Sequence, residues 1–408
     1  MVLGAGLVGS KGIRFDVGTS LLVLVTCEAA LMGSGRLLQV GPLTVKMLLF
    51  LVAQIYVIFR LVAGERLKLS TVYILLSFTL LLCFGSMVGM LRNSSIGYIA
   101  EDVDPLLYVY MLCFVEMTMK TKKHLQYVVR IIKAATVLMS VGYVLFITLL
   151  ITGAVSFGKF YAYLSSGSNA EFMFRGESGL FLYKGSIYIA VGLILFAFDK
   201  GRLSTFASAI AILGLLATGT RGFFFSLMAV LLVHALTGIG GIIIKIRYLI
   251  VPCAIVAMLL ILASGSLIGK EDSDAVRTET AFQVLNHITP LSIIYGNGLG
   301  MGVESKPAHM ENAYLEIFHK QGALGLLWWG SLFILLFTRY NKARRVHYLY
   351  AQPLLLSAIF VAFESLTNPY INNPIGCYVV LIAFTGLDVV SVGPSSTELS
   401  GQMELIIA

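Results

Sequence analysis

The sequence predicts an all-α polytopic membrane protein. Its 408 residues are 58% hydrophobic by type and only 12% charged, whereas a soluble domain carries about 25% charged residues. So few charges could not cover a water-facing surface, which excludes a soluble enzyme, a disordered chain and a secreted disulfide scaffold. The five cysteines lie inside apolar runs without the paired spacing of a metal or redox site, so we expect them to pack as small hydrophobic residues.

Apolar windows predict about twelve membrane-spanning helices, because a helix needs about 20 mostly apolar residues to cross the hydrocarbon core. The stretch after Lys11 and Arg14 is interpreted as the first span, since no small-residue cleavage site of a signal peptide is evident. We expect residues 1–408 to form a single integral membrane domain. The windows lie near 16–35, 42–63, 69–91, 104–119, 127–152, 180–198, 203–220, 222–240, 248–268, 322–338, 348–366 and 374–391.

Basic residues predict the orientation of these spans. With the N-terminus in the cytoplasm and the spans alternating, most of the 29 Lys and Arg residues fall on the inner side, in short loops. This bias is typical of a protein with both termini cytoplasmic. The inner clusters are Arg60/Arg66/Lys68, Lys120/Lys122/Lys123, Lys200/Arg202, Lys245/Arg247 and Arg339/Lys342/Arg344/Arg345.

Two long loops then lie on the outer face, at 153–179 and 269–321. The second is too long for a simple connection and contains the turn-rich run Tyr295-Gly-Asn-Gly-Leu-Gly300. Long loops on one face of a compact bundle often carry binding and chemistry, so we expect the functional site here.

Three arginines are candidates for binding an anion: Arg175, Arg221 and Arg277. They lie in or beside the outer face, where the orientation rule gives no reason for a positive charge. A guanidinium matches phosphate oxygens with a planar fork, so three could hold a pyrophosphate. The alternatives are a snorkelling or ion-paired residue at a helix end for Arg221, and simple solvation in a loop for the other two.

The segment His309-Met-Glu-Asn-Ala-Tyr-Leu315 carries candidate catalytic side chains just before a predicted span. Glu311 or His309 could accept a proton from a sugar hydroxyl. Asn312 and Tyr314 are candidate substrate-binding residues. The alternative is an ordinary capped helix start with solvated polar residues.

Three acids, Glu28, Glu116 and Glu364, fall within predicted spans, where an ionisable group is by default functional or paired. We expect Glu116 to pair with the inner lysines and Glu364 to approach the outer cavity, while Glu28 has no obvious partner. The sequence has no P-loop, no dinucleotide fingerprint, no Cys/His cluster, no Gly-x-Ser-x-Gly elbow and, in the outer loops, no Asp-rich motif. We therefore expect chemistry without a metal or cofactor, and no nucleic-acid partner.

Four motifs in order resemble those of the bacterial O-antigen polymerase and ligase superfamily. They are Arg175-Gly-Glu-Ser-Gly-Leu-Phe181, Thr220-Arg221-Gly222, Arg277 followed by Gly296-Asn-Gly-Leu-Gly300, and Glu311-Asn-Ala-Tyr-Leu315 with Gly322 and Gly325. The resemblance covers roughly residues 170–340. Tyr183-Lys184-Gly185 stands where the family usually has Pro-Asn, and Glu311 stands where the ligases place a histidine. The acidic residue favours a polymerase over a ligase.

The resemblance implies a fold of the membrane glycosyltransferase (GT-C-like) type in the bacterial inner membrane, with a periplasmic active site. It implies a glycan donor on undecaprenyl pyrophosphate and, as acceptor, the non-reducing sugar of another lipid-linked repeat unit. Arg175, Arg221 and Arg277 would bind the pyrophosphate, and Glu311, or alternatively His309, would be the base. A direct displacement would invert the anomeric centre, since we find no second nucleophile. Membrane lipid and, by analogy, a polysaccharide chain-length regulator are expected partners.

Two other functions remain open. An O-antigen ligase to lipid A–core would differ only in its acceptor. A transporter or flippase for lipid-linked sugars would instead place charges midway through several helices and show related halves with broken helices. The candidate residues cluster at one face, and we see no related halves in the sequence.

Overall fold

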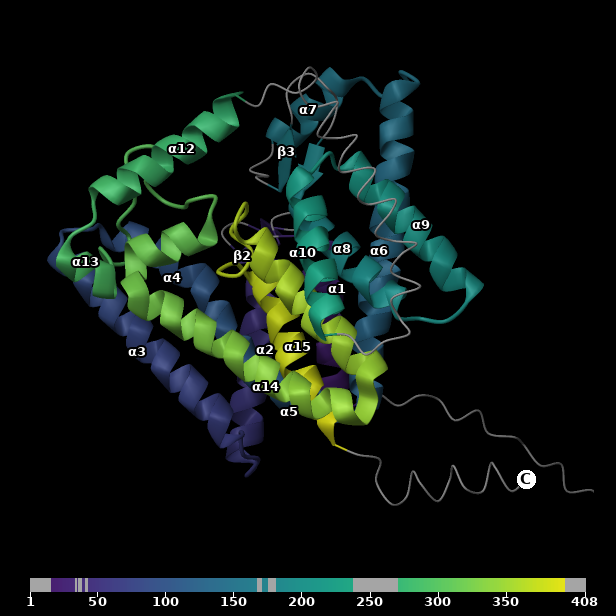
Figure 1. The fold of residues 1–408 in the computed structure, drawn as a ribbon, viewed down its shortest axis with the longest axis horizontal. Helices are drawn as coiled ribbons and strands as arrows, with labels where there is room; N and C mark the ends of the chain where they lie inside the picture. The colour runs from purple at the N-terminus through teal and green to yellow at the C-terminus, as the bar shows by residue number, and fades with distance from the viewer. Residues whose placement is uncertain are drawn as a thin grey trace, which may run out of the picture.

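The computed structural model of the chain describes residues 16–33, 35, 39–40, 43–166, 171–174, 181–237 and 271–392. Helices make up most of it (Figure 1). Two short antiparallel pairs of strands, which the sequence did not predict, accompany them: β1 (Gln39–Val40) with β2 (Leu43–Thr44), and β3 (Phe172–Phe174) with β4 (Phe181–Tyr183). The helices are α1 (Val17–Leu31), α2 (Val45–Val62), α3 (Leu69–Leu91), α4 (Ile96–Leu106), η1 (Leu107–Tyr110), α5 (Met111–Thr118), α6 (Lys122–Ile151), α7 (Phe157–Ser166), η3 (Lys184–Ser186), α8 (Ile187–Ala197), α9 (Arg202–Ala217), α10 (Arg221–Thr237), α12 (Glu271–Asn286), α13 (Pro290–Tyr295), α14 (Ala313–Glu364) and α15 (Pro374–Ser391).

The described helices match the predicted windows closely, with two differences. The window at 104–119 is not one helix, because η1 separates α4 from α5. The windows at 322–338 and 348–366 both fall within α14, whose backbone is not helical at Gly322 and His347. The window at 248–268 lies outside the described residues.

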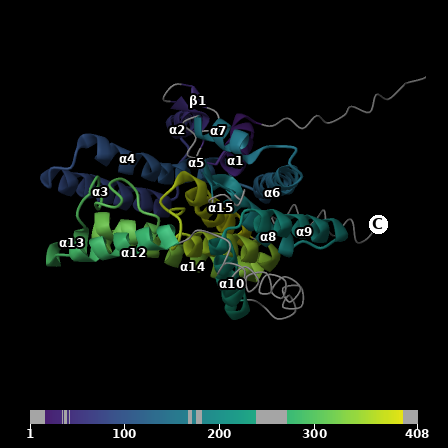
Figure 2. The ribbon, with the colours of Figure 1, turned by 90° about the horizontal axis from the view of Figure 1, so that it is seen from above.

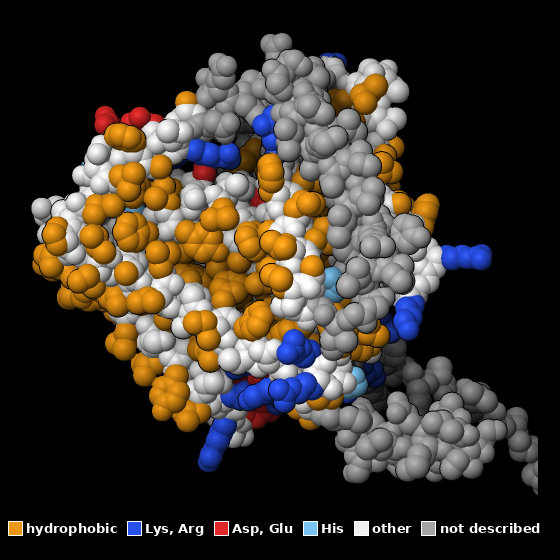
Figure 3. Space-filling model, in the orientation of Figure 1, with side chains coloured by type: hydrophobic (Ala, Val, Ile, Leu, Met, Phe, Trp, Pro, Cys, Tyr) orange, Lys and Arg blue, Asp and Glu red, His pale blue; other side chains and the backbone are white. Residues whose placement is uncertain are grey.

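Five helices among the described residues are long and apolar enough to cross a membrane: α2, α3, α6, α14 and α15. Four shorter apolar segments correspond to α1, η3–α8, α9 and α10. The chain is therefore a multi-pass membrane protein, and the number of crossings stays a prediction. Hydrophobic side chains cover the middle of the face in Figure 3, as expected of a surface in contact with lipid.

The centre of the fold is α15, which packs against α14, α6, α5 and α1. Its sequence is apolar nearly all round, and nearly every side chain from Ile375 to Leu387 is buried. A helix that is hydrophobic on all sides is expected in such a core position. Figures 1 and 2 place α3, α4, α12 and α13 on one side of the α14–α15 pair, and α6, α8 and α9 on the other.

The predicted inner loops that the structure describes, which exclude Lys245 and Arg247, gather at one end of the bundle. There Asp388 of α15 accepts from Lys68 Nζ at 2.7 Å and from Arg339 of α14 at 2.6 Å, while Lys120 Nζ lies 2.6 Å from Glu65. Lys and Arg side chains gather near the lower edge of the view in Figure 3. The orientation of the spans in the membrane stays a prediction.

The glycine-rich run Gly296–Gly300 is buried against α3 rather than exposed on a loop. Leu299 N donates to Gly85 O at 2.9 Å, and Arg92 of α3 donates to the side chain of Asn297. At about 1.5 Å per residue, Gly85 lies about 9 Å short of the end of α3. Part of the predicted outer loop 269–321 therefore packs alongside α3 and not beyond its end. The surrounding protein shields the polar backbone of this part from lipid.

Each of the three acids within the predicted spans has a polar or charged partner. Glu28 lies 3.7 Å from Lys46 Nζ, and both side chains are buried, which supplies the partner that the sequence did not suggest. Glu116 accepts from Lys68 N at 2.6 Å and from the Thr71 hydroxyl, so it is satisfied at the inner end, though by a backbone amide and not by a lysine ammonium. Glu364 is fully buried and accepts from Ser226 and Asn368 at 2.8 Å each.

Candidate functional site

A cavity of about 1310 Å³ opens at the end of the bundle opposite the inner basic loops. It exceeds the usual volume of a small-molecule pocket, about 300–1,000 Å³, so it has room for more than one sugar. Its walls come from the start of α2, the end of α4, η3, the start of α10, α12, the segment before α14, the first turns of α14 and the turn before α15.

Arg221 reaches this cavity because α10 begins there. Gly219 has a positive φ of 60°, which turns the chain after α9, and Thr220, Arg221 and Gly222 then line the wall. A Cβ at Gly222 would lie 2.7 Å from Glu364 Oε1, so only glycine lets this turn pack so closely on α14. The positive end of the α10 dipole and the guanidinium together favour an anion at this point.

Arg277 lines the same cavity from α12. Its Nε donates to Glu311 Oε2 at 2.6 Å, and Lys306 Nζ lies 3.5 Å from Glu311 Oε1. The carboxylate is one-third exposed. Two cations and one carboxylate therefore lie in contact in the wall of the cavity. An incoming phosphate could replace the carboxylate, because both offer oxygen acceptors to the same cations. Arg175, the third predicted arginine, lies outside the described residues.

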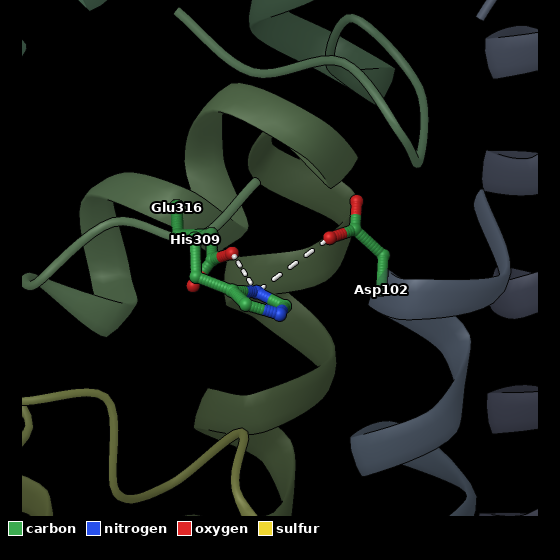
Figure 4. A group of neighbouring side chains, drawn as sticks. All are labelled: Asp102, His309 and Glu316. Atoms are coloured by element: carbon green, nitrogen blue, oxygen red, sulfur yellow. Dashed lines mark hydrogen bonds and ion pairs between the residues drawn. The ribbon is translucent and has the colours of Figure 1, made fainter. Parts of the chain in front are cut away.

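His309 lies in the wall with about half of its side chain exposed. Its Nδ1 lies 3.2 Å from Glu316 Oε1 and 3.7 Å from Asp102 Oδ1 (Figure 4). The hydrogen bond to Glu316 raises the pKa of His309 from its ordinary value of 6.5, although partial burial opposes this shift. A histidine held by a buried carboxylate is the usual arrangement of a catalytic base.

Lys320 joins the two acids beside His309. Its ammonium lies 2.6 Å from Asp102 Oδ1 and 2.7 Å from Glu316 Oε1, and all three side chains are nearly fully buried. Asp102 also accepts from Gly300 N at 2.6 Å, and Asn372 donates to Glu316 Oε2 at 2.9 Å. Burying these charges is tolerable because each one is paired and hydrogen-bonded.

The ligand atoms of Asp102, His309 and Glu316 lie within 4.8 Å of one another, a spacing that could hold a metal ion. The Lys320 ammonium, however, already places a positive charge in contact with both carboxylates. The donor set thus fits an internal ion-pair network better than a metal centre. Chemistry without a metal stays a prediction.

Asn312 and Tyr314, predicted to bind substrate, make contacts within the fold. Asn312 caps α14, where its Oδ1 accepts from Leu315 N at 3.0 Å. The Tyr314 hydroxyl donates to Ala362 O at 2.8 Å. These contacts match the capped-helix alternative.

Sequence reasoning did not select Asp102, Glu316, Lys320 or Lys306. The spacing of Glu316 and Lys320, one turn apart at the start of a helix, was a signal for a pair. The sequence around Asp102 contained no such signal, because the partners of Asp102 lie about two hundred residues away in sequence.

The comparison with curated proteins bears directly on this site. The chain is 27% identical over 376 residues to a protein of Shigella flexneri, covering 90% of this chain and 93% of the relative. That relative is an O-antigen polymerase. The two are distant homologues over nearly their full lengths, which confirms the resemblance that the motifs predicted. No protein-family model matches the chain.

Proposed function

We propose that this protein is an O-antigen polymerase. It transfers a growing glycan from undecaprenyl pyrophosphate to the non-reducing sugar of a second lipid-linked repeat unit. A hydroxyl oxygen of the acceptor forms a bond to the anomeric carbon, and the bond from that carbon to the pyrophosphate oxygen breaks. The electron pair leaves with the pyrophosphate, and the hydroxyl proton passes to a base.

The observation that carries this proposal is the gathering of Arg221, Arg277 and His309 in one cavity. These residues come from α10, α12 and the segment before α14, which are far apart in sequence. The reaction needs cations where negative charge builds on the leaving group and an acceptor for the hydroxyl proton nearby. The distant homology to the Shigella flexneri polymerase supports the same reaction.

We assign Arg221 and Arg277 to the pyrophosphate, with Lys306 beside them, and Arg175 as a third arginine on the basis of its sequence motif. Glu311 and His309 are the two candidate bases. The sequence favoured Glu311, but its carboxylate contacts Arg277 and Lys306. We therefore assign Glu311 to hold Arg277 until a pyrophosphate replaces it, and His309 to accept the proton.

An apolar wall supports a lipid-linked substrate. Met47, Phe50 and Leu51 of α2 and Leu107 of η1 line the cavity, and Leu51 and Leu107 are 50% and 37% exposed. These exposed apolar side chains are suited to contact a polyprenyl chain. A polyprenyl chain could remain in the bilayer along this wall while its pyrophosphate reaches the arginines.

The remaining features of the proposal follow from the sequence. The protein adopts the membrane glycosyltransferase (GT-C-like) type of fold in the inner membrane, with about twelve spans, as the apolar windows predict. Both termini are cytoplasmic and the cavity opens to the periplasm. The reaction is a single displacement that inverts the anomeric centre without a metal or cofactor. A chain-length regulator is the expected protein partner.

Complementation tests the choice of acceptor. In a strain of the source organism that lacks its polymerase gene, we expect the wild-type gene to restore the ladder of long polysaccharide on lipid A–core. A polymerase defect leaves single repeat units attached to core, whereas a ligase defect leaves none attached. If the deletion strain carries no attached sugar until the gene is restored, the ligase function replaces this proposal.

A further inference from the structure

The network of Asp102, Glu316 and Lys320 lies in the cavity wall beside His309, which is the most exposed of the four side chains. The three charges come from two different helices, α4 and α14, and are nearly fully buried. Burying three charges has a cost that stability alone does not explain, since apolar side chains of similar volume often serve as well. We therefore asked what the network does to His309.

Glu316 fixes the state of the His309 ring. Because Glu316 Oε1 accepts from Nδ1 at 3.2 Å, a neutral ring carries its proton on Nδ1 and its lone pair on Nε2. The ring lines the cavity and is half-exposed, so a substrate hydroxyl can approach it. The carboxylate also stabilises the imidazolium that forms when the ring accepts a proton.

Lys320 and Asp102 act on Glu316. A buried carboxylate would ordinarily become protonated, and a protonated Glu316 would no longer stabilise an imidazolium. Lys320 contacts both acids, and Asn372 engages the second oxygen of Glu316. With one ammonium and two carboxylates, the network lacks one positive charge, which His309 supplies when it becomes an imidazolium.

We infer that Glu316 is a positioning residue that orients His309 and keeps it basic, that Lys320 maintains Glu316 as a carboxylate, and that Asp102 holds the Lys320 ammonium in place. Asp102 also accepts from Gly300 N at 2.6 Å, which ties the glycine-rich run to the same network. This inference rests on the proposed function, because it assigns the proton acceptor of that reaction.

The charged groups near His309 set the expected pH dependence. Glu316 and Asp102 favour its protonated form, Lys320 opposes it, and burial opposes it. The hydrogen bond with Glu316 is the largest influence and raises the pKa. The base must be neutral to accept a proton, so the rate should rise with pH through a midpoint above 6.5.

The test is the initial rate of polymer formation by purified protein between about pH 5 and pH 9, with lipid-linked repeat units extracted from the polymerase-deficient strain. General-base catalysis typically contributes about 10²–10⁴-fold, so we expect His309→Gln to lose at least about 10²-fold. Glu316→Gln, which keeps the shape of the side chain, should move the midpoint to lower pH and reduce the plateau. The His309→Gln/Glu316→Gln double variant should be no slower than His309→Gln alone.

Three controls separate positioning from folding. Glu316→Asp keeps the charge and should restore the wild-type midpoint in part. Lys320→Arg should retain more activity than Lys320→Met. Lys133→Met breaks an ion pair of the same length, 2.6 Å to Asp199, which is more exposed and lies away from the cavity, and this variant should keep the wild-type pH profile.

Two results would overturn the inference. One is a slower Glu316→Gln variant with an unchanged midpoint, because a purely structural role would have that effect. The other is a double variant whose loss of rate equals the product of the losses in the two single variants. If the wild-type protein makes no polymer at any pH, the proposed function fails instead, and the two failures are thereby distinguished.

Discussion

Replacing Arg277 or Arg221 by alanine should abolish long polysaccharide while leaving the protein in the membrane. Both arginines line the cavity, and the negative charge of the leaving pyrophosphate needs cations that are already in place. Removing one such group typically slows an enzyme by about 10²–10³-fold. We expect this loss in the initial rate of undecaprenyl pyrophosphate release. Lysine at either position keeps the charge but not the planar fork and should recover only part of the rate.

Arg66→Ala is the matched control, because Arg66 is an exposed arginine at the opposite end of the bundle. It should leave the polymer ladder and the rate unchanged. Normal ladders from both Arg277→Ala and Arg221→Ala, at normal protein levels, would contradict the assignment of these residues to pyrophosphate.

Gly298→Ala should strongly destabilise the protein. Gly298 has a φ of +95°, and an added Cβ would lie 2.2 Å from Gly89 N on α3. Backbone strain of this kind costs about 1–3 kcal/mol, and overpacking about as much again. A loss of about 3 kcal/mol would be a large part of the 5–15 kcal/mol that stabilises a typical protein. The expected result is a lower Tm in detergent and less protein in the membrane.

Gly330→Ala provides the comparison on α14, where nothing lies within 4 Å of an added Cβ. Because alanine favours a helix over glycine by about 1 kcal/mol, this change should leave the Tm equal or slightly higher. A Gly298→Ala protein as stable as Gly330→Ala would mean that the glycine-rich run does not pack on α3 as described.

Much of the fold could be predicted from the sequence because the bilayer imposes one simple rule. Each span must be a long apolar helix, so hydropathy alone located α2, α3, α6 and α15 to within a few residues. Arg221 and Arg277 could be selected because a positive charge at the outer face has no other obvious reason. The structure brings both to one cavity with His309 and Glu311.

What the sequence could not predict depends on contacts between distant segments. Asp102 looked like one acid among several before a span, and only folding places it 2.6 Å from Lys320. Asn312 and Tyr314 show the same limit for local motifs. Their motif suggested contact with substrate, whereas the described contacts are a helix cap and a bond to Ala362 O. The motif therefore selected a segment that lines the cavity without distinguishing which of its side chains face the cavity.

We propose that this membrane protein itself forms glycosidic bonds and releases a lipid pyrophosphate for each one. The most direct test uses purified protein in vesicles without an ion gradient, supplied only with lipid-linked repeat units. If the protein is a polymerase, we expect a ladder of longer lipid-linked glycans and one undecaprenyl pyrophosphate released for each bond formed. Movement of repeat units across the vesicle membrane with no ladder and no released pyrophosphate would contradict this proposal and favour a transporter.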